Sequence, residues 1–182
     1  MSAAMHVLNG LGRINHLVGR TGIVLGSVLI AIMTSVVIAG VFFRYVLNNS
    51  LSWAEDVSLI MMVTTAFLVA PFAYRSGANV AIEILAEMLP KVLMRVTRLI
   101  INALVLWLLY RFFLESLVLI ERGWAIRVNT VPIPWAYPYM MVPVAFIAMA
   151  AVGIELLARD IYGIATQSDD ADLPHQAPRE PE

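Results

Sequence analysis

The feature that most constrains this chain is an uncharged apolar run between two arginines. Thr21–Phe43 holds no charged residue, and Arg20 and Arg44 flank it. At ~1.5 Å per residue, a helix over this run is roughly 35 Å long, enough to cross a ~30 Å hydrocarbon core. A segment in lipid must satisfy its own backbone, and the run does not alternate as the strands of a closed barrel do. The run therefore predicts a membrane-spanning helix.

Three more apolar stretches predict three further spans. The second carries Glu55 and Asp56 in its first turns, and the fourth carries Pro143 in its first turns, where the missing N–H costs little. They cover residues 51–74, residues 93–119, and a stretch that follows the prolines at 132, 134 and 138 and ends near 158. Hydrophobic residues make up 60% of the chain and charged residues 14%, against roughly 25% charged in soluble domains. The predicted fold class is an all-α integral membrane protein with four transmembrane helices.

Two segments outside the spans have characters of their own. Residues 79–89 place apolar side chains at helical spacing and acidic ones on another face, which predicts a short interfacial helix. The alternative is a solvated turn. The stretch 161–182 holds most of its charge as Asp and Glu, with three prolines, and is expected to be a disordered acidic cytoplasmic tail. The predicted organisation is a cytoplasmic segment at 1–20, a transmembrane domain at 21–160 and this tail.

The distribution of lysine and arginine predicts the orientation. Eight of these residues fall on the side of both termini and three on the other side, while Arg111 lies inside the third span. Because the cytoplasmic side carries the excess of positive charge, both termini should be cytoplasmic. The loops at 44–52 and 120–136 should then face outward. Tryptophans and tyrosines near these loops agree, since such rings favour the headgroup region.

The residue inventory argues against catalysis and against bound cofactors. The chain has no cysteine, and its histidines at 6, 16 and 175 lie outside the spans, so a bis-histidine haem is not expected. No metal-ligand spacing, phosphate-binding loop or nucleophile–base pair is recognisable. Glu155 and Asp160 are expected to be solvated at a cytoplasmic helix end. The net charge of −1 argues against a nucleic-acid partner. We therefore expect no catalytic, cofactor-binding or metal-binding residue.

The outward loop between the first two spans holds the first polar cluster. One interpretation is a plain helix start, in which Ser50 or Ser52 caps the second helix and Glu55 or Asp56 lies near its positive end. In the other interpretation, Arg44 and Glu55 have a specific role. They form either a clasp within this chain or a contact with a partner protein. Composition alone does not choose between clasp and contact.

Arg111 and Glu115 form the second polar cluster. They lie four positions apart, on one face of the third span. An ion pair inside the membrane is costly and is by default a functional hypothesis. The alternative is that Arg111 extends outward to the headgroups, where Glu115 would already lie. On the first span, small residues suggest a face for close helix approach, either to a partner or within this chain: Ala31, Ser35, Ala39 and Gly40.

The order of several motifs resembles the small membrane subunit (DctQ-type) of tripartite ATP-independent periplasmic (TRAP) transporters. The outward loop has the arginine–tyrosine, asparagine, serine–leucine and tryptophan–acidic pattern of that family: Arg44, Tyr45, Asn48, Ser50, Leu51, Trp53, Glu55 and Asp56. After the second span, the family's usual histidine and aspartate are replaced here, within an otherwise similar spacing: Arg75, Gly77, Asn79, Val80, Ile82 and Glu83. The prolines before the fourth span also fit. The resemblance covers roughly residues 20–160.

The resemblance implies a non-catalytic scaffold in a bacterial inner membrane, surrounded by lipids. In such systems a periplasmic binding protein captures a carboxylate-type solute, and a large multi-span subunit, driven by sodium, translocates it. The small subunit would bind the large one stably, and the motif residues above, from Arg44 to Glu83, would form its structural and partner interfaces. Two other classes stay open. One is an autonomous proton-coupled exporter that uses Glu55 or the pair of Arg111 and Glu115, and the other is a subunit of a membrane-bound enzyme.

Overall fold

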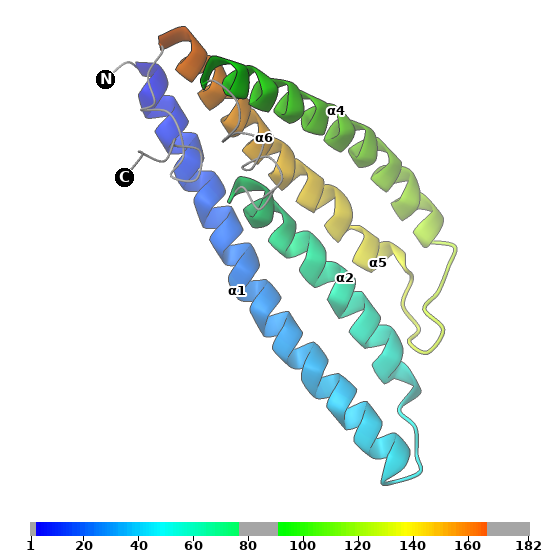
Figure 1. Cartoon of the computed structure of the whole chain (residues 1–182). Coiled ribbons are helices and arrows are strands. Elements are labelled where there is room, and N and C mark those ends of the chain that lie inside the picture. Colours follow the sequence, from blue (N-terminus) through cyan, green and yellow to red (C-terminus); the bar gives the residue numbers. More distant parts are fainter. Residues whose placement is uncertain (1–2, 77–90, 167–182) are drawn as a thin grey trace, which may run out of the picture.

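The chain folds into long helices, as the apolar runs predict. The computed structural model describes residues 3–76 and 91–166 (Figure 1). Four helices within these ranges are long and apolar enough to cross a membrane. They are α1 (Ala3–Tyr45), α2 (Ser52–Arg75), α4 (Lys91–Gly123) and α6 (Met141–Thr166), and a short helix, α5 (Ala136–Tyr139), precedes α6. The all-α, four-span fold is confirmed. The predicted interfacial helix at 79–89 and most of the predicted tail lie outside the described residues.

The four long helices lie side by side rather than around a central axis. Figure 1 shows them in the order α1, α2, α6 and α4, with the start of α1 and the end of α6 at one end of the array. Helix α6 contacts α1, α2 and α4. In its most apolar stretch of 18 residues, 39% of the residues are buried, whereas 11% are buried in the corresponding stretch of each of the other three helices. The array therefore has one central helix, and the described residues leave broad apolar faces of α1, α2 and α4 uncovered.

Glycines on α1 allow it to lie very close to α2. A Cβ atom at Gly22 would lie 2.3 Å from the carbonyl oxygen of Leu68, and one at Gly26 would lie 2.8 Å from Cγ2 of Val69. Small residues let two membrane helices approach until their backbones touch. Gly40 faces α2 in the same way, so this member of the small-residue face on α1 packs within the chain.

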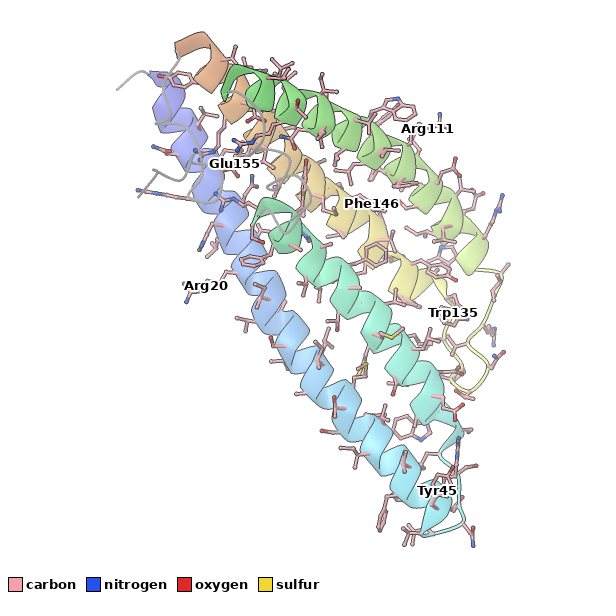
Figure 2. The ribbon with its side chains drawn as sticks, in the orientation of Figure 1. Arg20, Tyr45, Arg111, Trp135, Phe146 and Glu155 are labelled. Atoms are coloured by element: carbon pink, nitrogen blue, oxygen red, sulfur yellow. The ribbon has the colours of Figure 1, made fainter. Side chains whose placement is uncertain are left out.

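Aromatic rings join the three helices on the other side of the array. Phe146 of α6 meets Phe67 of α2 edge to face, with ring centroids 5.9 Å apart. It also stacks on Phe112 of α4 at a centroid distance of 6.0 Å. Figure 2 shows Phe146 between its two neighbouring helices. Such pairs add specific geometry to the burial of apolar area, and here they fix the spacing of α2, α6 and α4.

The start of α2 differs from the predicted capping. The N-cap position falls on Leu51, and no side chain forms a capping hydrogen bond there. Ser52 is already the first helical residue and Ser50 lies one position too early, so the expectation that either serine caps this helix is wrong. Asn48 takes a left-handed conformation, with φ of 48°, which asparagine tolerates better than most residues. This residue turns the chain from the end of α1 toward α2.

The loop from α4 to α5 folds back on itself. The N–H of Val128 donates to the carbonyl of Ile133 at 3.0 Å, and the N–H of Trp135 donates to the carbonyl of Ile126 at 3.0 Å. The Trp135 ring stacks on Tyr139 of α5. Because Pro143 lies in the first turn of α6, as predicted, it breaks no hydrogen bond in the middle of a helix.

Candidate functional site: polar clusters at the two ends of the array

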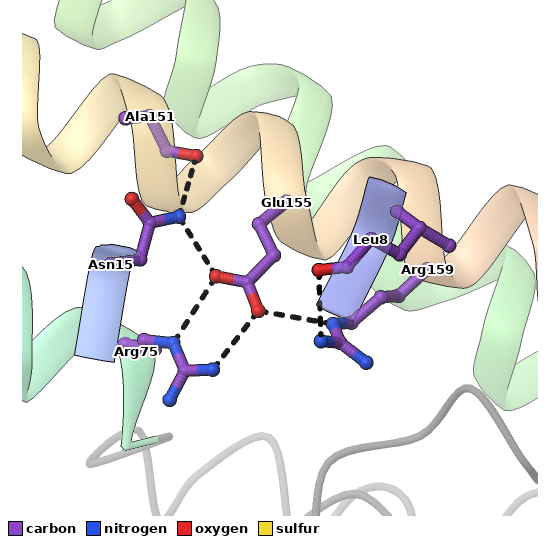
Figure 3. A network of polar contacts seen from close by, with 6 residues as sticks. All are labelled: Leu8, Asn15, Arg75, Ala151, Glu155 and Arg159. Carbon is purple, nitrogen blue, oxygen red and sulfur yellow. Dashed lines mark hydrogen bonds and ion pairs between the residues drawn. The ribbon is translucent and has the colours of Figure 1, made fainter. Parts of the chain in front are cut away.

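A buried polar cluster surrounds Glu155 near the end of the array where α1 begins and α6 ends (Figure 3). Its carboxylate is completely buried. Arg75 donates to it in bidentate fashion, with Nε 3.1 Å from Oε2 and Nη2 3.0 Å from Oε1. Arg159 Nε donates to Oε1 at 3.1 Å, and Asn15 Nδ2 donates to Oε2 at 2.8 Å. One carboxylate on α6 thus holds α1 and α2 at once.

The backbone of α1 takes part in the same cluster. Asn15 Nδ2 also donates to the carbonyl of Ala151 at 3.1 Å. A Cβ atom at Gly12 would lie 2.7 Å from Nη2 of Arg159 and 2.8 Å from Oε1 of Glu155. Only a residue without a side chain leaves room for the charged groups at this point. Two residues of α1 therefore suit the buried carboxylate. Gly12 leaves space for it, and Asn15, three positions later, donates a hydrogen bond to it.

A second buried cluster lies next to the first and brings in α4. Asp160, which is 1% exposed, accepts a hydrogen bond from Asn102 Nδ2 at 2.9 Å. The hydroxyl of Tyr74 in turn donates to Oδ1 of Asn102 at 3.1 Å. This chain of contacts runs from α2 through α4 to α6. Together the two clusters connect all four spanning helices at one end.

The expectation that Glu155 and Asp160 are solvated is therefore wrong. Both lie on α6, which the other three helices flank, so their side chains point into protein rather than into water. The partners that compensate the buried charge are far away in sequence: Asn15 is 140 positions from Glu155 and Arg75 is 80 positions from it. The local sequence shows only that two acidic residues, Glu155 and Asp160, lie in an apolar span. This pattern is the same whether the carboxylates are buried or are exposed at a helix end.

Among the motif residues after the second span, Arg75 can be placed and the others cannot. Its guanidinium belongs to the Glu155 cluster and is 16% exposed. It therefore ties the C-terminal end of α2 to α6 within this chain. Asn79 and Glu83 lie outside the described residues, and their predicted interface role stays a prediction.

At the opposite end, Arg44 and Glu55 form an ion pair between the last turn of α1 and the first turn of α2. This is the geometry of the predicted clasp. The two side chains are 48% and 71% exposed, so water screens the pair and its contribution to stability is small. The partner-contact interpretation is compatible with the same exposure, and the role of the pair stays a prediction.

Asp56 makes a contact that the sequence did not suggest. Its carboxylate accepts hydrogen bonds from the N–H of Thr130, at 3.1 Å, and from the hydroxyl of the same residue. This connects the start of α2 to the loop between α4 and α5. Around it, Tyr45 is 76% exposed and Trp53 is 42% exposed. Figure 2 shows Tyr45 at the tip of the array, so the aromatic residues of the motif lie on an open surface.

Arg111 and Glu115 are both exposed on α4, and within the described part of the chain no ion pair joins them. Figure 2 shows Arg111 projecting from α4 away from the other helices. Glu115 instead lines an open groove of about 330 Å³ between α4 and α6, together with Ser116, Arg122 and Phe146 among others. In the structure the two side chains make no ion pair with each other. Their predicted role as an intramembrane pair stays a prediction.

The arrangement can fix helices, and its groups are engaged in doing so. The carboxylates of Glu155 and Asp160 are held by amide, guanidinium or both kinds of donor. In the described ranges, no group of three or more His, Asp or Glu residues is placed to hold a metal ion. At each end of the array, polar contacts thus join neighbouring helices, while the lengths between the two ends are mainly apolar. This is the construction of a multi-pass membrane protein with uncovered lateral faces.

Comparison with known proteins identifies the family. The sequence model of the family described as tripartite ATP-independent periplasmic transporters, DctQ component, matches residues 33–163. The chain therefore belongs to the DctQ family, a family of transporter components and not of enzymes. The match covers most of the four-helix region, including the motif residues of the outward loop. A comparison with curated proteins found no match.

Proposed function

We propose that this chain is the small, non-catalytic scaffold subunit of a sodium-driven TRAP secondary transporter. It forms a stable heterodimer with a large multi-span membrane subunit in the bacterial inner membrane. A periplasmic binding protein delivers a carboxylate-type solute to that complex. The DctQ match over residues 33–163 is the observation that carries the proposal.

The distribution of polar contacts supports a scaffold role. Buried clusters connect the inner ends of all four spanning helices, and exposed contacts connect α1, α2 and the α4–α5 loop at the outer end. Such a framework keeps the faces of the helices in fixed relative positions. A helper subunit needs this property, because a partner helix is positioned only by a surface that does not deform.

The test measures both assembly and transport. The subunit is expressed with its large partner and binding protein in a host that lacks uptake of carboxylate-type solutes. A tag on this chain should recover the large subunit from mild detergent, and sodium-dependent solute uptake should require both membrane subunits. Uptake by the large subunit and binding protein alone, at the full rate, would contradict a required scaffold role. Recovery of only a stable monomer from co-expressing cells would contradict the heterodimer.

A further inference from the structure

Helix α4 presents a stripe of large exposed side chains at alternating spacings of three and four residues. Leu104, Trp107, Leu114 and Val118 are between 40% and 60% exposed, and Arg111 is exposed in the middle of them. Repeats of three and four place these residues in one line along a helix. Among the described residues, α6 is the long helix that packs extensively on α4. Arg111, in the middle of the stripe, points away from α6 (Figure 2), whereas Val118, at the end of the stripe, also lines the groove between the two helices.

Arg111 lies inside the apolar span of α4. It is 13 positions after Arg98 and 10 positions before Glu121, or roughly 20 Å and 15 Å along the helix at ~1.5 Å per residue. The side chains of a helix tilt toward its N-terminus, which for α4 is the predicted inner side. Extension to the nearer, outer headgroups would run against this tilt. A guanidinium that follows the tilt lies among lipid chains, which offer no acceptor.

The stripe contains two hydrogen-bond donors with nothing to donate to. The Trp107 indole and the Arg111 guanidinium lie four positions apart, and neither makes a hydrogen bond to the described part of the chain. Arginine and tryptophan have donors and no acceptor. An unpaired charge at the centre of a bilayer costs several kcal/mol by the lower estimates. Glu115, four positions after Arg111 on α4, makes no ion pair with it, and another molecule with an oxygen acceptor and a negative charge would satisfy both donors.

The exposed face of α1 lacks this feature. Two hydroxyl groups of this face are satisfied within the helix: Thr34 Oγ1 donates to the carbonyl of Ile30 at 2.8 Å, and Ser35 Oγ donates to that of Ala31 at 2.9 Å. Between Arg20 and Arg44 the helix carries no charged side chain, and apart from small hydroxyl residues its exposed face is apolar. The two outer helices of the array thus differ, since α4 carries a charged donor within its span and α1 carries none.

We propose that the stripe of α4 from Leu104 to Val118 binds a transmembrane helix of the large subunit that carries a carboxylate opposite Arg111. The inference rests on the proposed function and names the interface for it. A carboxylate matches the charge and the planar donor pattern of the guanidinium, and a side-chain or backbone oxygen on the same helix accepts the Trp107 N–H. The pattern of threes and fours suits packing against one helix.

Crosslinking in intact membranes tests the position of the interface. A photo-reactive amino acid replaces Leu104 or Leu114 on α4, and Val28 or Ile38 on α1 as exposed controls. Adducts with the large subunit should form from the α4 positions and not from the α1 positions. Adducts from α1 alone would overturn the inference and leave the heterodimer intact. Adducts from α4 only with lipid, or only with a second copy of this chain, would overturn it too.

Substitution of the arginine tests the charge. Arg111→Leu should lower recovery of the large subunit by about tenfold or more, because the partner's carboxylate is left buried and unpaired. Arg111→Lys, which keeps the charge and loses the planar donor pattern, should restore part of the recovery. The matched control Arg122→Leu, near the outer end of the same helix, should recover as much partner as wild type. Equal recovery with Arg111→Leu and with wild type would overturn the inference, whereas loss of recovery from the wild type itself would mean that the proposed function is wrong.

Discussion

At the scale of single residues, the buried carboxylate of Glu155 accepts hydrogen bonds from two arginines and one asparagine. Glu155 is the only acidic partner of Arg75 and one partner of Arg159 in the contacts described. A buried ion pair often adds little compared with an apolar replacement, but the removal of one partner leaves an uncompensated buried charge. The cluster therefore makes correct packing of α1, α2 and α6 a condition for stability.

Replacement of Glu155 by glutamine should be strongly destabilising. Glutamine keeps the size of the side chain but removes the negative charge between two arginines. We expect a loss of about 3–5 kcal/mol in the free energy of unfolding, typical of a broken buried pair. The measurement is denaturation of the purified subunit in mixed detergent micelles. Glu115→Gln, at an exposed carboxylate on α4, is the matched control and should unfold like wild type; equal stability of both variants would show that the cluster is not structural.

The ion pair at the outer end should behave as a structural clasp. Arg44→Glu and Glu55→Arg each place two like charges together, so each should lower the amount of subunit in the membrane. The double swap restores opposite charges and should partly restore that amount. The measurement is membrane abundance together with uptake per inserted subunit. Normal abundance with reduced uptake in both single variants, and no rescue by the swap, would instead assign the pair to a partner contact.

At the scale of elements, the α1–α2 hairpin depends on backbone contact. The Cβ of any larger residue at Gly22 would overlap the Leu68 carbonyl oxygen. That oxygen belongs to a helix backbone and cannot move aside as a flexible side chain can. The aligned glycines of α1 thus have a packing role that outweighs their low helix propensity.

Substitution of Gly22 by alanine should separate the two helices. Overpacking of this kind costs about 1–3 kcal/mol, and we expect that loss in the free energy of unfolding. Gly10 provides the control, because a Cβ atom there would meet nothing within 4 Å. Gly10→Ala should be neutral or should stabilise the helix by up to about 1 kcal/mol. If both alanine variants unfold alike, close contact between α1 and α2 is not what holds the hairpin.

At the scale of the whole molecule, the chain is an array held at its two ends and open along its sides. The central position of α6 explains why the polar residues of that helix are buried while most apolar residues of the other helices are exposed. In a soluble protein such exposure would cause aggregation. In a membrane it provides the surfaces that contact lipid and a partner protein.

The charges of the chain predict the orientation of the whole array in the membrane. Reporter fusions after Asn49 and Asn129 should be located outside, and fusions after Gly77 and Gln167 inside, because eight of eleven loop and terminal lysines and arginines lie on the side of the termini. Pairs of enzyme reporters that are active on one side only provide the measurement. Inversion at any two of these four positions would refute cytoplasmic termini.

The number and order of the spans, and the family, were determined by the sequence alone. Bilayer thickness converts the length of an apolar run into a helix with no knowledge of its neighbours, and the motifs of the outward loop are contiguous enough to be read directly. Arg44 and Glu55 were paired correctly for the same reason, since a short loop brings their helix ends together.

Only the tertiary structure decided which polar residues are buried and which faces are left uncovered. Glu155 and Asp160 have the same local sequence character as solvated residues at a helix end, and their partners come from three other helices. Nor does periodicity distinguish a face that meets another helix from one that meets lipid, because both are apolar in a membrane. These properties depend on the lateral order α1, α2, α6, α4, which is set by packing between residues far apart in the chain.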